Sequence, residues 1–237
     1  MEENQEKSKL NITGIRYIVK SIFMIIIQVI LLILFSGSIF ILSGWIFYIL
    51  YSITTLGTIA ALYIKDIELV NLRGKSQKGT KSWDQKILLI WIIFIFLTPI
   101  IAGLDFRFRL TIIVSMDFLL ITIGSIIWII GGVLGAWAMV VNSYFEASAR
   151  IQRNRSHKVV SIGPYKYIRH PGYLASLMGC IAIPLIFCSL LTIIPSAVIF
   201  ILFAIRTFLE DKMLIDELDG YGEYTQKVKF RLFPRIW

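Results

Sequence analysis

The sequence predicts an all-α membrane protein with about six transmembrane helices, and three observations lead to this prediction. The 237-residue chain is 57% hydrophobic, with a mean hydropathy of +0.77, which is far above that of soluble domains. Its apolar segments are about as long as the roughly 20 residues that a helix needs to cross the hydrocarbon core. Its basic residues gather in alternate connections between these segments.

The six apolar segments define the predicted helices. They lie at about 20–42, 44–64, 87–103, 112–140, 172–189 and 192–209. Residues 1–19 are polar and are expected to form a frayed tail. We place the break between the first two segments near Ser43 and Gly44. The last two segments are short and meet near Ser189, which predicts a C-terminal helical hairpin.

Charge is distributed unevenly between the two sides of the predicted membrane. The net charge is +9, and all lysines and arginines except Arg107 and Arg109 fall in the N-terminal tail, the second connection, the fourth connection and the C-terminal end. The positive-inside rule therefore predicts that both termini are cytoplasmic. This alternation argues against a nucleic-acid partner. Two histidines and two cysteines without a ligand cluster predict no metal site.

The fourth apolar segment carries Gly131 and Gly135 at GxxxG spacing. In an apolar helix this spacing permits close packing against a neighbouring helix. A nucleotide-binding glycine loop would need a preceding strand, which the sequence does not predict.

A polar, proline-containing stretch from Gly163 to Tyr173 separates the long apolar blocks. Pro164 and Pro171 disfavour the helical region for Gly163 and His170, which should be extended or turned. Pro171 suits the first turn of the next helix. The amino end of that helix would favour an anionic group. An ordinary loop with interfacial aromatic residues explains the stretch equally well.

The last apolar helix continues beyond the membrane, with a predicted glycine stop at Gly220. Arg206 and Glu210 are one turn apart on one face. They form either an interfacial ion pair or the mouth of a pocket. The basic connection over 141–170 is likewise either a lipid-facing segment or one wall of that pocket.

The C-terminal part of the chain resembles the isoprenylcysteine carboxyl methyltransferase family of integral membrane enzymes. The resemblance covers about residues 138–237, and residues 1–137 would be an N-terminal transmembrane scaffold. It rests on an ordered set of motifs: Gly163-Pro164-Tyr165, Arg169-His170-Pro171-Gly172-Tyr173, Arg206 to Asp211, Gly220 to Tyr224, and Arg231-Leu232-Phe233-Pro234.

The resemblance implies methyl transfer from S-adenosylmethionine at the cytoplasmic membrane face. It implies a cofactor pocket built from the loop before the hairpin and the segment after it. The implied cofactor contacts are Gln152, His157, Lys158, Val159, Val160, Tyr165, Arg169, His170, Pro171, Gly172, Tyr173 and Glu210. Arg206 would bind the carboxylate of the acceptor. Asp211 stands where the family often has a second glutamate, and its role is left open.

The expected acceptor is lipophilic, such as the carboxylate of a prenylated cysteine or a similar lipid-linked group, and no metal is expected to take part. Two other activities remain open: N-methylation of a phospholipid amine, and a sterol- or steroid-type reduction with NADPH, since such reductases share an Arg-His-Pro stretch. A membrane scaffold without enzymatic activity is the third class of function.

Overall fold

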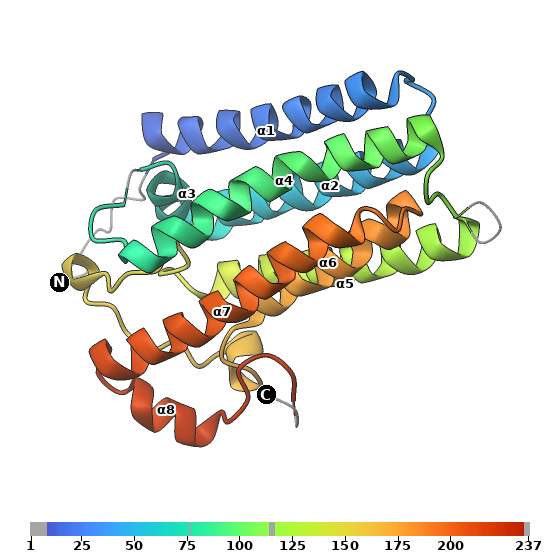
Figure 1. Ribbon diagram of the computed structural model, residues 1–237. Coiled ribbons are helices and arrows are strands. Elements are labelled where there is room, and N and C mark those ends of the chain that lie inside the picture. The colour runs from blue at the N-terminus through green and yellow to red at the C-terminus, as the bar shows by residue number, and fades with distance from the viewer. Residues whose placement is uncertain (1–8, 76, 114–116, 235–237) are drawn as a thin grey trace.

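The protein is a bundle of long helices packed side by side (Figure 1). The structure, a computed structural model, describes residues 9–75, 77–113 and 117–234. The long helices are α1 (Ile12–Ser36), α2 (Leu42–Lys65), α4 (Ser82–Phe108), α5 (Asp117–Val141), α6 (Pro171–Phe187) and α7 (Ile193–Glu217). The short elements are α3 (Ile67–Arg73), α8 (Tyr221–Lys227) and the 3-10 turns Arg153–Arg155 and Gly163–Lys166.

The predicted all-α membrane architecture is confirmed. Across the described ranges there is no named strand, and five helices are long and apolar enough to cross a membrane: α1, α2, α4, α5 and α7. The apolar helix α6 has 17 residues and contains Pro184. It forms the predicted hairpin with α7, since only 188–192 separate the two helices.

The first helix differs from its prediction at both ends. It begins at Ile12 rather than near residue 20, because the Asn11 side chain accepts hydrogen bonds from the backbone N–H groups of Thr13 and Gly14 and so caps the first turn. It ends at Ser36, because Gly37 takes a left-handed conformation with φ of 67°. The expectation of a frayed tail through residue 19 and a break near Ser43 was therefore wrong.

Glycines allow α5 to pack closely against α6. A Cβ atom on Gly124 would lie 2.8 Å from side-chain atoms of Leu185 and Ile186, and one on Gly131 would lie 3.2 Å from the carbonyl oxygen of Ala175. A side chain at Gly124 would therefore force the helices apart. The close packing predicted from the GxxxG spacing is confirmed.

The connections gather at the two ends of the bundle. At one end lie α3, the connection between α5 and α6, and α8 (Figure 1). The predicted glycine stop was wrong, because α7 already ends at Glu217 with Leu218 as its C-cap. Gly220, which has a φ of 79°, instead precedes α8 as its N-cap. The chain then folds back, since the N–H groups of Arg169 and His170 donate to the carbonyls of Phe230 (2.9 Å) and Arg231 (3.0 Å). We refer to this end as the cavity end.

Candidate functional site

A cavity of about 950 Å³ opens among the long helices and the connections at the cavity end. Most residues that the sequence analysis singled out line it, although they come from separate parts of the chain. The lining includes His157, Lys158, Val159, Val160, Tyr165, Arg169, His170, Gly172, Tyr173, Arg206 and Glu210. Gln152 and Pro171 are not among the lining residues.

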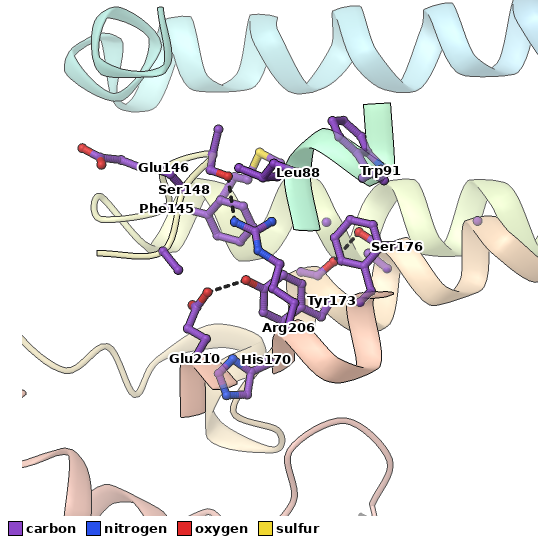
Figure 2. A pocket seen from close by; sticks show the side chains of 18 of the residues that line it. Leu88, Trp91, Phe145, Glu146, Ser148, His170, Tyr173, Ser176, Arg206 and Glu210 are labelled. Atoms are coloured by element: carbon purple, nitrogen blue, oxygen red, sulfur yellow. Dashed lines mark hydrogen bonds between the residues drawn. The ribbon is translucent and has the colours of Figure 1, made fainter. Parts of the chain in front are cut away.

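Arg206, Tyr173 and Glu210 form the polar centre of this cavity (Figure 2). The Tyr173 hydroxyl donates a hydrogen bond to Oε2 of Glu210. The guanidinium carbon of Arg206 lies 5.4 Å from the centroid of the Tyr173 ring, a cation–π distance. On the other side, the Tyr173 and His170 rings stack with centroids 5.7 Å apart. A carboxylate, a guanidinium and an aromatic face therefore border the same space.

A buried acid that the sequence analysis missed holds Arg206. Asp84, in the first turn of α4, is fully buried. It accepts from Nε of Arg206 at 2.6 Å and from Nη2 at 3.2 Å, while Nη2 also donates to the Ala147 carbonyl at 2.8 Å. The Ala149 N–H donates to the same carboxylate at 2.7 Å. In the sequence Asp84 lies in the polar connection before the third apolar segment, so no local signal marked it.

These contacts leave one side of the Arg206 guanidinium uncommitted. Among the described residues, Nη1 has no hydrogen-bond acceptor, while Nε and Nη2 are both bonded. Arginine presents several donors in a planar fork. Asp84 therefore compensates the charge of Arg206 and fixes the plane of its guanidinium, and Nη1 is available to a ligand.

Asp211 joins the start of α6, the end of α7 and the C-terminal segment. Its carboxylate is fully buried and accepts from Nε and Nη2 of Arg169, both at 2.8 Å. It also lies 3.0 Å from Nε2 of His170 and accepts from the Tyr221 hydroxyl at 2.9 Å and from Nε of Arg231 at 2.8 Å. It is absent from the cavity lining, so its visible role is to hold the residues that line it.

The electrostatics of Arg169 follow from this cluster. Burial alone would lower the pKa of the Arg169 guanidinium, but the hydrogen bonds and charge of Asp211 raise that pKa above its ordinary value. Nη1 of Arg169 donates to the carbonyls of Val228 and Lys229, both at 2.8 Å. The returning C-terminal segment is therefore fastened to the residue that precedes His170.

Gln152 supports the loop that carries His157. Its Nε2 donates to the Tyr144 carbonyl at 2.8 Å, and its Oε1 accepts from Nη1 of Arg155 at 2.9 Å. The backbone N–H of Gln152 points to Nδ1 of His157 at 3.5 Å. The sequence analysis expected a cofactor contact at Gln152, but the described side chain is buried within the loop.

His157 presents a neutral imidazole beside the cavity. Burial, together with the charges of Arg155 and Arg150, lowers the pKa of His157 to about 4. Its ring centroid lies 4.4 Å from that of Tyr144. At neutral pH this side chain therefore offers an uncharged aromatic surface rather than a cation.

Close backbone approach is required at Gly172. A Cβ atom there would lie 2.4 Å from the Phe145 ring, so only glycine lets the loop cover the start of α6.

Tyr165 is held by the C-terminal part of the chain, since the Tyr224 hydroxyl donates to the Tyr165 carbonyl at 2.7 Å. Burial raises the pKa of the Tyr165 hydroxyl well above its ordinary value, so this hydroxyl is protonated at neutral pH.

The arrangement can bind an organic cation that also carries an aromatic group. Glu210 supplies negative charge, and His157 supplies a ring face. Nη1 of Arg206 supplies a donor for a second, polar ligand. In residues 9–75, 77–113 and 117–234 there is no cluster of side chains that could hold a metal ion.

Comparisons with known proteins point to one family. Residues 122–216 match the family model described as "Isoprenylcysteine carboxyl methyltransferase (ICMT) family". Two proteins, from Oryza sativa subsp. indica and from Oryza sativa subsp. japonica, are each 28% identical to this chain over 109 residues. Both are named "Probable protein-S-isoprenylcysteine O-methyltransferase".

The aligned part is 45% of this chain and 57% of each rice protein. The chain thus spans a little more than half the length of these relatives. The matched region contains the loop from Asn142, all of α6 and nearly all of α7. It leaves out helices α1 to α4, and with them Asp84. The resemblance indicated by the motifs is confirmed, and residues 122–216 match the isoprenylcysteine carboxyl methyltransferase family.

Proposed function

We propose that this protein is an integral membrane methyltransferase that moves a methyl group from S-adenosylmethionine to a lipophilic acceptor. The acceptor group is the carboxylate of a prenylated cysteine or of a similar lipid-linked compound. The observation that supports this most is the shared cavity. Residues expected to bind the cofactor and residues from the interior of the helix bundle line the same space of about 950 Å³, near the upper end of the roughly 300–1,000 Å³ of ligand pockets.

The side chains at the cavity end fit such a cofactor. Its sulfonium and ammonium groups are cations, which the Glu210 carboxylate would attract. Its adenine is flat and aromatic, and the His157 ring borders the cavity. Its own carboxylate would be accommodated by the amino end of α6 at Gly172. The neutral state of His157 avoids placing a further positive charge beside a cationic ligand.

The cofactor would supply a methyl carbon whose bond to the acceptor oxygen forms as its bond to sulfur breaks, with the electron pair left on sulfur and no proton transferred. A carboxylate is already a competent nucleophile, so the protein contributes proximity, alignment and exclusion of water. Nη1 of Arg206 would hold one acceptor oxygen. Asp84 would keep that donor in place, because it fixes the other side of the guanidinium.

We further propose that the cavity end faces the cytoplasm. The connections at this end carry the basic residues Lys75, Lys78, Lys81, Arg150 and Lys166, and the positive-inside rule assigns such connections to the cytoplasm. Both termini would then be cytoplasmic. A lipophilic acceptor would enter between helices while its polar group stays at this face.

A phospholipid amine is the second candidate acceptor, and Asp84 is the observation that favours it. Because Asp84 compensates the charge of Arg206, this site repels a protonated amine less than it would with an unpaired guanidinium. An amine must lose its proton before it attacks. Its methylation rate would therefore rise with pH over the range where the rate with a carboxylate stays level.

The test is equilibrium binding of S-adenosylmethionine to the detergent-purified protein, with NADPH as the competing ligand. We expect micromolar binding of S-adenosylmethionine that is weakened in Glu210→Gln. Glu217→Gln is the matched control, since Glu217 lies on the same helix but pairs with Lys81 at the surface, and it should bind normally. Binding of NADPH with no binding of S-adenosylmethionine would overturn the proposal in favour of a reductase.

A further inference from the structure

The cavity continues from Arg206 far into the helix bundle. It reaches Gln28 of α1, Tyr48 and Tyr51 of α2, and Thr98 of α4. A helix rises 1.5 Å per residue, which places Thr98 about 21 Å along α4 from Asp84. We call Gln28, Tyr48, Tyr51 and Thr98 the deep polar cluster.

Three members of the deep polar cluster are almost completely buried. The exposed fractions are 3% for Gln28, 4% for Tyr48 and 5% for Thr98. Gln28 Nε2 donates to the Met24 carbonyl at 3.2 Å, and Thr98 Oγ1 donates to the Phe94 carbonyl at 2.8 Å. The Gln28 side chain also hydrogen-bonds the side chain of Tyr51 on α2. Thr98 bonds only its own helix, so the lone pairs of its hydroxyl can still accept.

Tyr48 differs from the other members because its hydroxyl lacks a partner. This hydroxyl is buried and makes no hydrogen bond to any described residue. Its ring packs edge-on against Phe47, with centroids 4.9 Å apart. A buried donor without a partner costs free energy, and water inside a bilayer is scarce.

A plain hydrocarbon tail would suit this region poorly. It would fill the space beside Ile95, Ile183 and Ile199, which also line the cavity. It would offer nothing to the hydroxyl and amide groups on the facing helices α1 and α2. Polar side chains within a membrane bundle that face a cavity mark ligand pathways.

We propose that the deep polar cluster binds an oxygen-bearing group, a hydroxyl or a carbonyl, at the end of the acceptor chain remote from the methylated group. This inference rests on the proposed function, because it specifies which lipophilic acceptors the cavity selects. The acceptor is then an oxygenated lipid that spans about 20 Å between Arg206 and Thr98. An unsubstituted acyl tail of the same length would bind less tightly.

The experiment compares two probes of equal length, hexadecanoate and 16-hydroxyhexadecanoate, with the full chain in nanodiscs. Binding is followed by tryptophan fluorescence, because Trp91 and Trp128 line the cavity. We expect the hydroxylated probe to bind at least tenfold more tightly. In the double variant Tyr48→Phe, Thr98→Val the preference should fall below threefold. Thr122→Val is the matched control, since Thr122 is exposed on α5 and bonds only its own helix.

Equal affinity of the two probes would overturn the inference, as would a preference that survives the double variant or a lack of binding by both probes. Methyl transfer is scored separately in the same samples with labelled S-adenosylmethionine. A hydroxyl preference without transfer to either probe would support the deep polar cluster and count against the proposed function. Transfer to both probes with equal kcat/KM and equal affinity would support the function and overturn the cluster.

Discussion

The two ends of α4 each bury a carboxylate, and the two acids have different partners. Asp84, at the cavity end, faces a guanidinium at 2.6 Å and a backbone N–H at 2.7 Å. Asp105, at the opposite end, accepts from the N–H of Thr111 at 2.7 Å, from its hydroxyl at 2.6 Å, and from the hydroxyl of Ser189. Both acids are fully buried.

The difference separates a carboxylate that pairs with a cation from a carboxylate that accepts hydrogen bonds from uncharged groups. Asp105 ties the end of α4 to the turn between α6 and α7 through uncharged donors, which holds these helices together. Asp84 compensates a cation that also borders the cavity, so its loss would expose a buried charge. Two fully buried acids on one helix can therefore play different roles, and the groups that hydrogen-bond each carboxylate determine its role.

The largest expected effect comes from Asp84→Ala, which breaks this comparison at the cavity end. It leaves Arg206 buried without its counter-ion, and removing one partner of a buried ion pair costs about 3–5 kcal/mol. Thermal unfolding in detergent should show a large drop in Tm. The double variant Asp84→Ala, Arg206→Leu should regain part of this loss, because no unpaired charge remains. Strictly additive effects of the two changes would contradict the pairing.

Glu210→Gln should have the next largest effect, on binding rather than on stability. The carboxylate is half-buried and takes the Tyr173 hydroxyl, which the amide oxygen can still accept. Losing a charge-assisted interaction of about 1.5–3 kcal/mol would weaken S-adenosylmethionine binding roughly 10- to 100-fold. Calorimetry would measure the affinity, and an unchanged affinity would remove Glu210 from the cofactor site.

Asp105→Asn should act on stability alone and by a smaller amount. The amide keeps one oxygen acceptor for Thr111 or Ser189 and loses the other, and losing a hydrogen bond to a carboxylate costs about 1.5–3 kcal/mol. S-adenosylmethionine affinity should stay within about twofold of the wild type, because Asp105 lies at the far end of α4 and distant sites do not couple strongly. A loss of affinity equal to that of Glu210→Gln would show that the two ends of α4 do not differ as proposed.

The last effect is a pH dependence at the cavity end, which is absent at neutral pH and develops only in acid. The folded-state pKa of His157 is about 4, against an ordinary value of 6.5. Between these values the unfolded chain takes up a proton that the folded protein excludes, so stability falls as the pH falls through this window. The Tm difference between wild type and His157→Gln should shift in favour of the variant as the pH drops from 7 to 4. A constant difference would contradict the neutral imidazole.

The sequence predicted the parts of the fold that depend on local pattern. Apolar length located the helices, and Pro171 marked the first turn of α6. The start of α1 was missed because one capping side chain, Asn11, extends the helix into polar sequence. The end of α1 was missed because the apolar pattern continues past Gly37.

The candidate site was predicted in part. The motifs around His157, His170 and Glu210 identified side chains that line the cavity. Gln152 was expected in the same set, although its hydrogen bonds lie within the loop. Asp84 was missed because it is far from Arg206 in the sequence and lies outside residues 138–237, which carry the motifs.

The sequence by itself determined the helical membrane class, the side of the bundle with the basic connections, and the motifs that match the family. These follow from the length, composition and order of residues, which need no knowledge of contacts. Only the tertiary structure decided that Asp84 compensates Arg206, that Asp211 joins three segments, and that the cavity reaches Tyr48. The partners of a buried charge and the shape of a cavity depend on which helices are neighbours, and that is set by packing of side chains distant in the chain.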